Sequence, residues 1–94
     1  MDENEIVKSE TSFSELNKSS TQVKDKFDVV IYDNPRLAMD TALNKAYLAL
    51  RDGGQMIIKN PVETKWTIYK YYALTKFDLI SEKKNKVILK RKSK

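Results

Sequence analysis

The segment from Phe27 to Asn60 constrains the fold of this chain more than any other part of the sequence. It reads FDVVIYDNPRLAMDTALNKAYLALRDGGQMIIKN, which is the order strand, helix, double-glycine turn, strand. Two parallel strands joined by a helix form a right-handed crossover, and such a unit builds a parallel sheet. Gly53 and Gly54 are the only glycines of the chain, so no glycine-rich phosphate loop precedes the first strand. We therefore expect an α/β scaffold without a visible cofactor loop.

The first strand is predicted at Phe27–Asp33, because a nearly continuous run of β-branched and aromatic residues is typical of a strand buried on both faces. Asn34 and Pro35 are a favourable N-cap and first helical residue, so a helix is predicted from about Pro35 to Arg51. Its apolar residues repeat at helical spacing. One of the two glycines should take the left-handed conformation that ends this helix. A second strand is predicted at Gln55–Lys59.

The rest of the domain is predicted as a helix followed by a hairpin. The helix spans Val62–Lys76, and its apolar side consists of Val62, Trp66, Tyr69 and Ala73, widened by Ile68 and Tyr72. Phe77–Glu82 and Lys86–Arg91 read as two short strands joined by the polar turn Lys84-Asn85, which is the pattern of a β-hairpin.

The chain of 94 residues is expected to form one small domain. Residues 1–25 are predicted as a polar N-terminal segment, partly ordered at most, and residues 26–92 as the α/β domain with a basic C-terminal strand and tail. A parallel sheet normally needs helices on both faces. Because the sequence offers two good helices at most, a partner is expected to cover one face or one edge of the sheet.

The N-terminal segment contains one weak helix signal. Phe13 and Leu16 mark a short helix or turn, which Ser12 or Ser14 could cap. Glu15 follows Ser12 at the spacing of a capping box.

The composition excludes several classes of catalytic site. The chain contains no cysteine and no histidine, so it lacks disulfides, thiolate metal sites, the commonest metal ligand and the usual general base. Zinc hydrolysis and serine–histidine or cysteine–histidine catalysis are therefore excluded, and we expect no enzymatic activity, no cofactor and no metal. The acidic, polar start and the short apolar runs predict a soluble cytoplasmic protein that does not enter a membrane.

The net charge of +5 is unevenly distributed along the chain. The first ten residues are acidic and the C-terminal residues are strongly basic. Such asymmetry is typical of interaction with a nucleic acid, although an edge strand whose lysines prevent aggregation gives the same pattern. The candidate nucleic-acid-binding residues are Lys83, Lys84, Lys86, Lys90, Arg91, Lys92 and Lys94.

The predicted second helix alternates aromatic rings with positive charges. Trp66, Lys70 and Tyr71 are candidate partner-interface residues, because Trp and Tyr are good interface anchors. Rings of this kind could instead stack on single-stranded nucleic acid, or pack on the sheet with Tyr71 alone exposed.

Polar residues at the ends of the two predicted parallel strands form another candidate site. Asp33, Asn60, Glu63 and Lys65 fall at the carboxyl end of the sheet, where α/β proteins place their sites. They could line a vestigial ligand cleft, or they could serve only loops and helix caps. No pair of carboxylates has a spacing that indicates general acid–base catalysis.

The order strand, helix, GG turn, strand, helix, hairpin resembles the C-terminal half of class I S-adenosylmethionine-dependent methyltransferases. LRDGGQMII resembles the L-x-x-G-G turn of that superfamily, and FDLISEKKNKVILKRK fits the antiparallel hairpin that ends its sheet. The resemblance covers about residues 26–92 and implies a truncated Rossmann-like sheet of β-α-β-α-β-β order. A shorter segment, IIKNPVETK, is similar to part of the N-terminal domain of anamorsin, a methyltransferase-like domain without the cofactor loop.

The departures from the enzyme family concern the cofactor. In that family a glycine-rich loop after the first strand and an acid after the second hold the cofactor, and neither has a place before Phe27. The iron–sulfur function of anamorsin depends on cysteines, which this chain lacks. We therefore expect a non-catalytic accessory subunit that docks on a larger protein in a nucleic-acid-processing complex. Direct DNA or RNA binding through the basic C-terminal region, and one half of a split methyltransferase, remain open alternatives.

Overall fold

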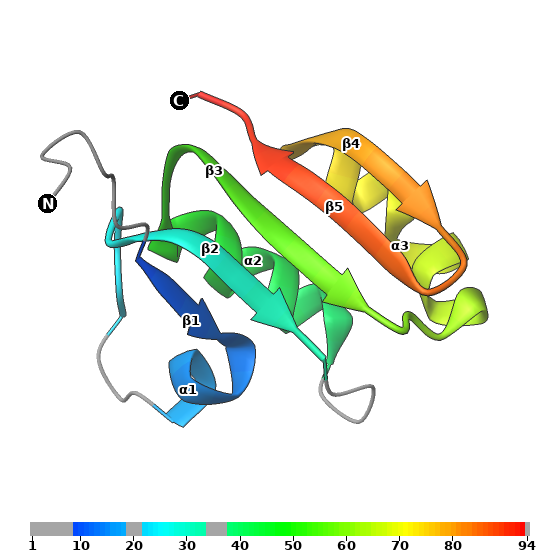
Figure 1. Cartoon of the computed structure of the whole chain (residues 1–94), viewed down its shortest axis with the longest axis horizontal. Helices are drawn as coiled ribbons and strands as arrows, with labels where there is room; N and C mark the ends of the chain where they lie inside the picture. Colours follow the sequence, from blue (N-terminus) through cyan, green and yellow to red (C-terminus); the bar gives the residue numbers. More distant parts are fainter. Residues whose placement is uncertain (1–8, 19–21, 34–37, 94) are drawn as a thin grey trace, which may run out of the picture.

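The computed structural model describes residues 9–18, 22–33 and 38–93, which form a five-stranded sheet and three helices (Figure 1). Along the chain the elements are β1 (Glu10–Ser12), α1 (Phe13–Lys18), β2 (Phe27–Tyr32), α2 (Met39–Ala49), β3 (Leu50–Lys59), α3 (Glu63–Leu74), β4 (Phe77–Lys83) and β5 (Lys86–Arg91). The α/β class predicted from the sequence is confirmed.

The sheet is mixed, and its strands lie in the order β1-β2-β3-β5-β4. Strands β1, β2 and β3 are parallel, whereas β5 runs antiparallel to both of its neighbours. β4 and β5 form a hairpin whose turn is at Lys84 and Asn85, as predicted. β5 therefore lies inside the sheet, and the edges of the described sheet are β1 and β4.

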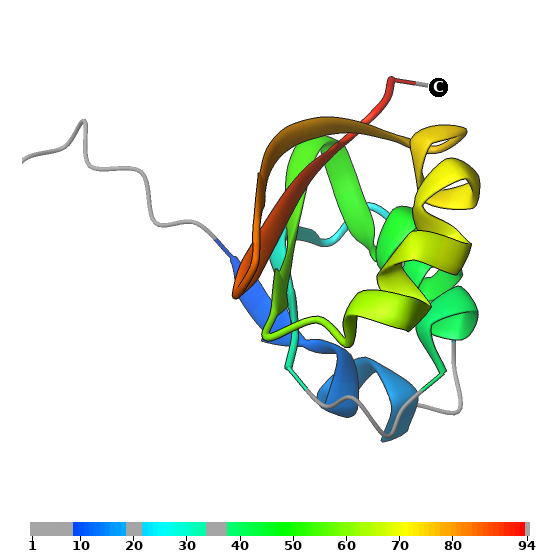
Figure 2. The ribbon, with the colours of Figure 1, turned by 90° about the vertical axis from the view of Figure 1, so that its right-hand side faces the viewer.

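All three described helices pack on the same face of the sheet (Figure 2). The core lies between this face and the helices, and Leu43, Met56 and Ile58 are fully buried in it. Phe13 of α1 meets Tyr32 of β2 edge to face, with ring centroids 5.7 Å apart, which is a favoured arrangement of aromatic rings. Burial raises the pKa of Tyr32, so its phenol stays neutral. In the described part of the chain, no helix covers the opposite face (Figure 2).

The short helix α1 begins at the predicted cap. The backbone N–H of Glu15 donates a hydrogen bond to Ser12 Oγ at 3.2 Å, so Ser12 caps the helix. β1 was not predicted, and it pairs with β2 in parallel. Phe13 and Leu16 are buried, so the residues before 26 contribute a strand and a helix to the packed unit.

The long helix α2 is shorter than predicted at its start. Ala38 precedes it with the extended backbone angles φ −65° and ψ 125°, so the helix begins at Met39 and not at Pro35. Asn34 and Pro35 lie outside the described residues. The predicted apolar stripe of the helix is confirmed by the burial of Met39, Ala42, Leu43 and Ala46.

The double glycine does not end this helix, contrary to the prediction. α2 ends before Leu50, where β3 begins, so both glycines lie inside the strand. The register is irregular there, because β3 advances from Leu50 to Gln55 while β2 advances only from Phe27 to Val29. Gly53 has a φ of +78° within this irregularity, a conformation that strains residues with a Cβ. A glycine in the left-handed region was correctly predicted, but this glycine, Gly53, lies inside a strand and not at the end of a helix.

Helix α3 is less buried than the sequence predicted. Trp66 and Ala73 face the core. Ile68 and Tyr72, which were expected to widen that side, are 70% and 38% exposed. The alternative in which the aromatic residues of this helix pack on the sheet with Tyr71 alone exposed is therefore wrong, because Tyr72 is exposed too. No described helix is long and apolar enough to cross a membrane.

The last residue of β5, Arg91, is buried with an exposure of 1%. Its Nη1 donates to Asp25 Oδ1 at 2.6 Å, and its Nη2 lies 3.9 Å from Asp52 Oδ1. The guanidinium carbon is 4.7 Å from the ring centroid of Tyr47, which is a cation–π contact. Arg91 therefore ties the end of β5 to the loop before β2, to β3 and to α2.

The substitution Gly54→Ala should destabilise the fold. A Cβ at this position would lie 2.9 Å from the carbonyl O of Arg51 and 3.1 Å from that of Asp28, and these backbone atoms cannot move aside as a flexible side chain would. We expect the free energy of unfolding to fall by about 1–3 kcal/mol, measured by urea denaturation followed by circular dichroism. Gly53→Asn is the control and should cost about 1 kcal/mol or less, because Asn tolerates a positive φ. Equal losses in the two variants would contradict this account.

Candidate interaction face of the sheet

The uncovered face of the sheet carries an apolar band. Side chains alternate between the two faces along a strand, so the neighbours of the buried core residues on β2, β3 and β5 point away from the helices. Ile31, Ile57 and Ile88 lie directly beside one another on these strands, and Val29 precedes Ile31 on the same face. Each is half-buried, because its neighbours in the sheet shield it from the sides. These four residues are called the apolar band.

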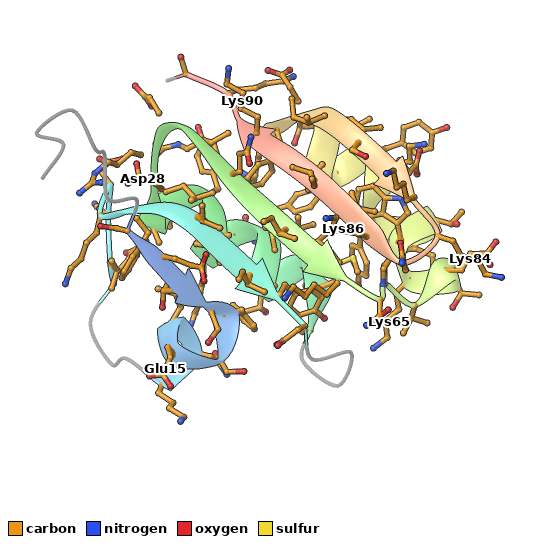
Figure 3. All side chains as sticks on the ribbon, viewed as in Figure 1. Glu15, Asp28, Lys65, Lys84, Lys86 and Lys90 are labelled. Carbon is orange, nitrogen blue, oxygen red and sulfur yellow. The ribbon has the colours of Figure 1, made fainter. Side chains whose placement is uncertain are left out.

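A row of lysines lies next to the apolar band. Lys59 of β3 pairs with Lys86 of β5, which in turn pairs with Lys83 of β4. The three residues are exposed and lie abreast on adjacent strands, and they are called the lysine row. Lys84 follows in the hairpin turn, and Lys90 lies farther along β5 (Figure 3).

Among the described residues, no ion pair joins a lysine of the row to a carboxylate, although Asp33 follows the residue of β2 that pairs with Ile58, next to Lys59. The ion pairs found there are Lys18 with Glu15, Arg51 with Asp28, Lys70 with Glu82, and Arg91 with Asp25 and Asp52. Like charges directly opposite each other on neighbouring strands destabilise a sheet. The direct pairing of Lys59 with Lys86 and of Lys86 with Lys83 is therefore electrostatically unfavourable.

The structure divides the predicted nucleic-acid-binding residues into two groups. The exposed group consists of Lys83, Lys84, Lys86 and Lys90. Arg91 is buried, and Lys92 Nζ donates to the carbonyl O of Leu74 at 2.9 Å, so the fold already engages both side chains. Lys94 lies outside the described residues. Lys59 was not predicted, because only the pairing of β3 with β5 brings it beside the hairpin lysines.

The predicted partner-interface residues do not form one surface. Trp66 is buried, and its indole N–H donates to Glu82 Oε2 at 2.6 Å. Lys70 Nζ donates to Glu82 Oε1 at 3.0 Å. These hydrogen bonds, above all the one from Trp66, lower the pKa of Glu82. Tyr71 is 79% exposed on α3, and Ile68, three residues before it, is 70% exposed.

The carboxyl end of the parallel strands offers little room for a ligand. The hollow there has a volume of about 10 Å³ and is lined by Tyr32, Met39, Lys59, Asn60, Pro61, Val62 and Lys65. Such a volume holds one water at most. Asp33 is exposed and does not line it, and Glu63 lines a different hollow. Of the four predicted cleft residues, the structure therefore brings only Asn60 and Lys65 together around one hollow.

A larger groove of about 560 Å³ lies between the start of α3 and the hairpin turn. It is lined by Pro61, Glu63, Trp66, Thr67, Glu82, Lys83 and Lys84. One of its two carboxylates, Glu82, is already engaged by Trp66 and Lys70. Within residues 9–18, 22–33 and 38–93, no cluster of three or more acidic side chains is placed to hold a metal ion.

No protein-family model matches the chain, and no curated protein sequence matches it. Among solved structures, the chain is similar to the 16S rRNA N2 G1207 methyltransferase RsmC of T. thermophilus in complex with AdoMet and guanosine, at 17% identity and a TM-score of 0.55. The match covers 77% of this chain and only 22% of the RsmC chain. A possible exported protein from Bordetella parapertussis matches at 10% identity and a TM-score of 0.49, over 79% of this chain and 42% of that one. The likeness to RsmC supports a methyltransferase-like fold, and the narrower resemblance to anamorsin stays a prediction.

The substitution Glu82→Gln should reduce stability in a pH-dependent way. Because the folded protein lowers the pKa of Glu82, the charged carboxylate stabilises the fold above its ordinary pKa, and this contribution is lost as the pH falls through the lowered value. The variant should therefore have a lower urea midpoint than the wild type at neutral pH, and the two midpoints should converge in acid. Glu15→Gln removes the same charge from the exposed ion pair with Lys18 and serves as the control. A difference between Glu82→Gln and wild type that stays constant from neutral to acidic pH would contradict this assignment.

Proposed function

We propose that this chain is a non-catalytic accessory module that docks on a larger protein through the apolar band. The observation that carries this proposal is the one-sided placement of the described helices (Figure 2). Sheets built from parallel crossovers are normally covered on both faces. Covering the aliphatic side chains of the band would stabilise a complex by about 25 cal/mol for each Å² of apolar surface removed from water.

The residues around the band indicate the chemistry of the partner surface. On the side away from the lysine row, Val29 of the band shares one register across the sheet with Glu10, Gln55, Lys90 and Asp78. Their charges are mixed in sign, so they match a polar rim rather than a surface of a single charge. The partner should therefore present an apolar centre of aliphatic or aromatic side chains, bordered on this side by polar groups of both signs.

The likeness to RsmC supports a partner larger than this chain. The matched unit makes up 22% of the RsmC chain, so a unit of this fold is there part of a protein several times its size. In this chain, the described residues leave one sheet face without a covering layer. We infer that additional protein supplies that layer.

The double substitution Ile57→Thr and Ile88→Thr should weaken docking while the fold persists. Threonine keeps the β-branched shape that strands prefer, but it exchanges apolar surface at the centre of the band for a hydroxyl group. We expect the affinity for the partner to fall by about tenfold to a hundredfold. The partner would first be captured by a photo-crosslinking amino acid at position 57 in cells, then purified and titrated against both forms of the chain.

Two controls locate the interface. Ile68→Thr makes the same chemical change at a residue that is 70% exposed on the helical side, and it should leave the affinity unchanged. A photo-crosslinker in place of Tyr71 should not capture the partner. The proposal is overturned if crosslinks from position 57 join two copies of this chain, or if the double variant binds the partner as tightly as the wild type.

Titration calorimetry with S-adenosylmethionine should give no binding heat. Gly53 and Gly54 are the only glycines and lie inside β3, so no strand is followed by a glycine-rich loop that could approach the cofactor closely. The titration is repeated with the captured partner present. A saturable heat that requires both chains would favour the split methyltransferase over a non-catalytic module.

A further inference from the structure

We propose that the lysine row binds the phosphate backbone of a nucleic acid. Lys59, Lys86 and Lys83 lie abreast on β3, β5 and β4. Neighbouring strands are about 4.8 Å apart, so the row spans about 10 Å. One strand of duplex DNA carries a phosphate about every 3.4 Å along the helix axis. Because each ammonium group stands on a long flexible stem, the three lysines reach separate phosphates.

Within the described residues, no ion pair with a carboxylate offsets the repulsion between the lysines of this row. Lys59 faces Lys86, and Lys86 faces Lys83, without a carboxylate between them. Their mutual repulsion opposes pairing of the strands. A polyanion bound to the row would replace the repulsion between the lysines with attraction to its own charges, and it would release its own counterions.

Protection of a sheet edge does not explain the row. Lysines guard edge strands against pairing with other chains, but β3 and β5 are both interior strands. Of the three lysines, Lys83 alone lies on an edge strand. Lys59 and Lys86 therefore contribute positive charge to a face of the sheet and not to its rim.

The face around the row favours contact with the backbone over reading of bases. The residues that neighbour the row on β3 and β5 are Ile57 and Ile88, which offer no aromatic platform on which a base could stack. Tyr71, the most exposed aromatic side chain described, lies on α3 on the other side of the sheet. Binding should therefore be independent of base sequence and strongly dependent on salt. Single strands and duplexes should both bind, because they share the phosphate chemistry.

The test is fluorescence anisotropy with short labelled single-stranded and duplex oligonucleotides, titrated with the full chain at several salt concentrations. The triple variant Lys59→Gln, Lys83→Gln and Lys86→Gln should bind at least tenfold more weakly at low salt. With the duplex, the slope of log affinity against log salt concentration should be less steep for the triple variant than for the wild type. The difference in slope should be about 0.9 for each phosphate that the variant no longer neutralises.

The matched control removes three positive charges elsewhere. Lys18→Gln, Lys24→Gln and Lys45→Gln change α1, the loop before β2 and α2, and this variant should bind almost as tightly as the wild type. Circular dichroism confirms that both triple variants remain folded.

Three results would overturn the proposal. The first is an equal loss of affinity in both triple variants, which would show that net charge alone drives binding. The second is undiminished binding by the lysine-row variant. The third is poly-L-glutamate binding as tightly as the oligonucleotides, which would assign the row to an acidic protein surface. None of these results affects docking through the apolar band, which the Ile57→Thr and Ile88→Thr variant tests separately.

Discussion

A single layer of helices on one face of a five-stranded sheet is the constraint on which the rest of this structure depends. Val30, Met56 and Leu89 lie in register across β2, β3 and β5, and each has an exposure of 0% because the helices cover it. The residues that alternate with these along the same strands point to the opposite face. The apolar band and the lysine row are therefore the direct consequence of burying one face only.

The C-terminal strand is held in this arrangement by a buried charge. Arg91 has no exposed side-chain surface, while its partners Asp25 and Asp52 keep side-chain exposures of 54% and 62%. The cost of removing the guanidinium from water offsets much of its attraction to these exposed carboxylates, so the ion pairs add little net stability. Its geometry is nevertheless specific, since the guanidinium must meet Asp25 and the ring of Tyr47 together. We infer that Arg91 contributes mainly to the position of β5, and hence to the alignment of Lys86 with Lys59.

The features that depend on residues adjacent in the chain were the most predictable from the sequence. The hairpin is recognisable from two short strands around the polar turn Lys84-Asn85. β1 was missed because Glu10–Ser12 has no apolar pattern, and its strand exists only through pairing with β2. In the candidate site, Lys59 was not predicted. It lies beside Lys86 only because β3 pairs with β5, and the sequence does not show this pairing. Arg91 belongs to the predicted basic run, yet long-range contacts place it in the interior. Composition therefore located the basic region, and topology decided which side chains face outward.

The apolar band and the lysine row occupy neighbouring rows of one face, and the two proposed interactions should respond oppositely to ionic strength. Contacts of the band with a partner depend on removal of apolar surface from water, which salt does not screen and which sulfate strengthens. Contacts of the lysine row with phosphates depend on release of counterions, so they weaken steeply as salt rises. A protein bound over Ile57 and Ile88 would lie beside Lys59 and Lys86 and would border any bound phosphate backbone. We therefore expect, from the two proposals together, that the face holds a partner at high salt and adds a nucleic acid as the ionic strength falls.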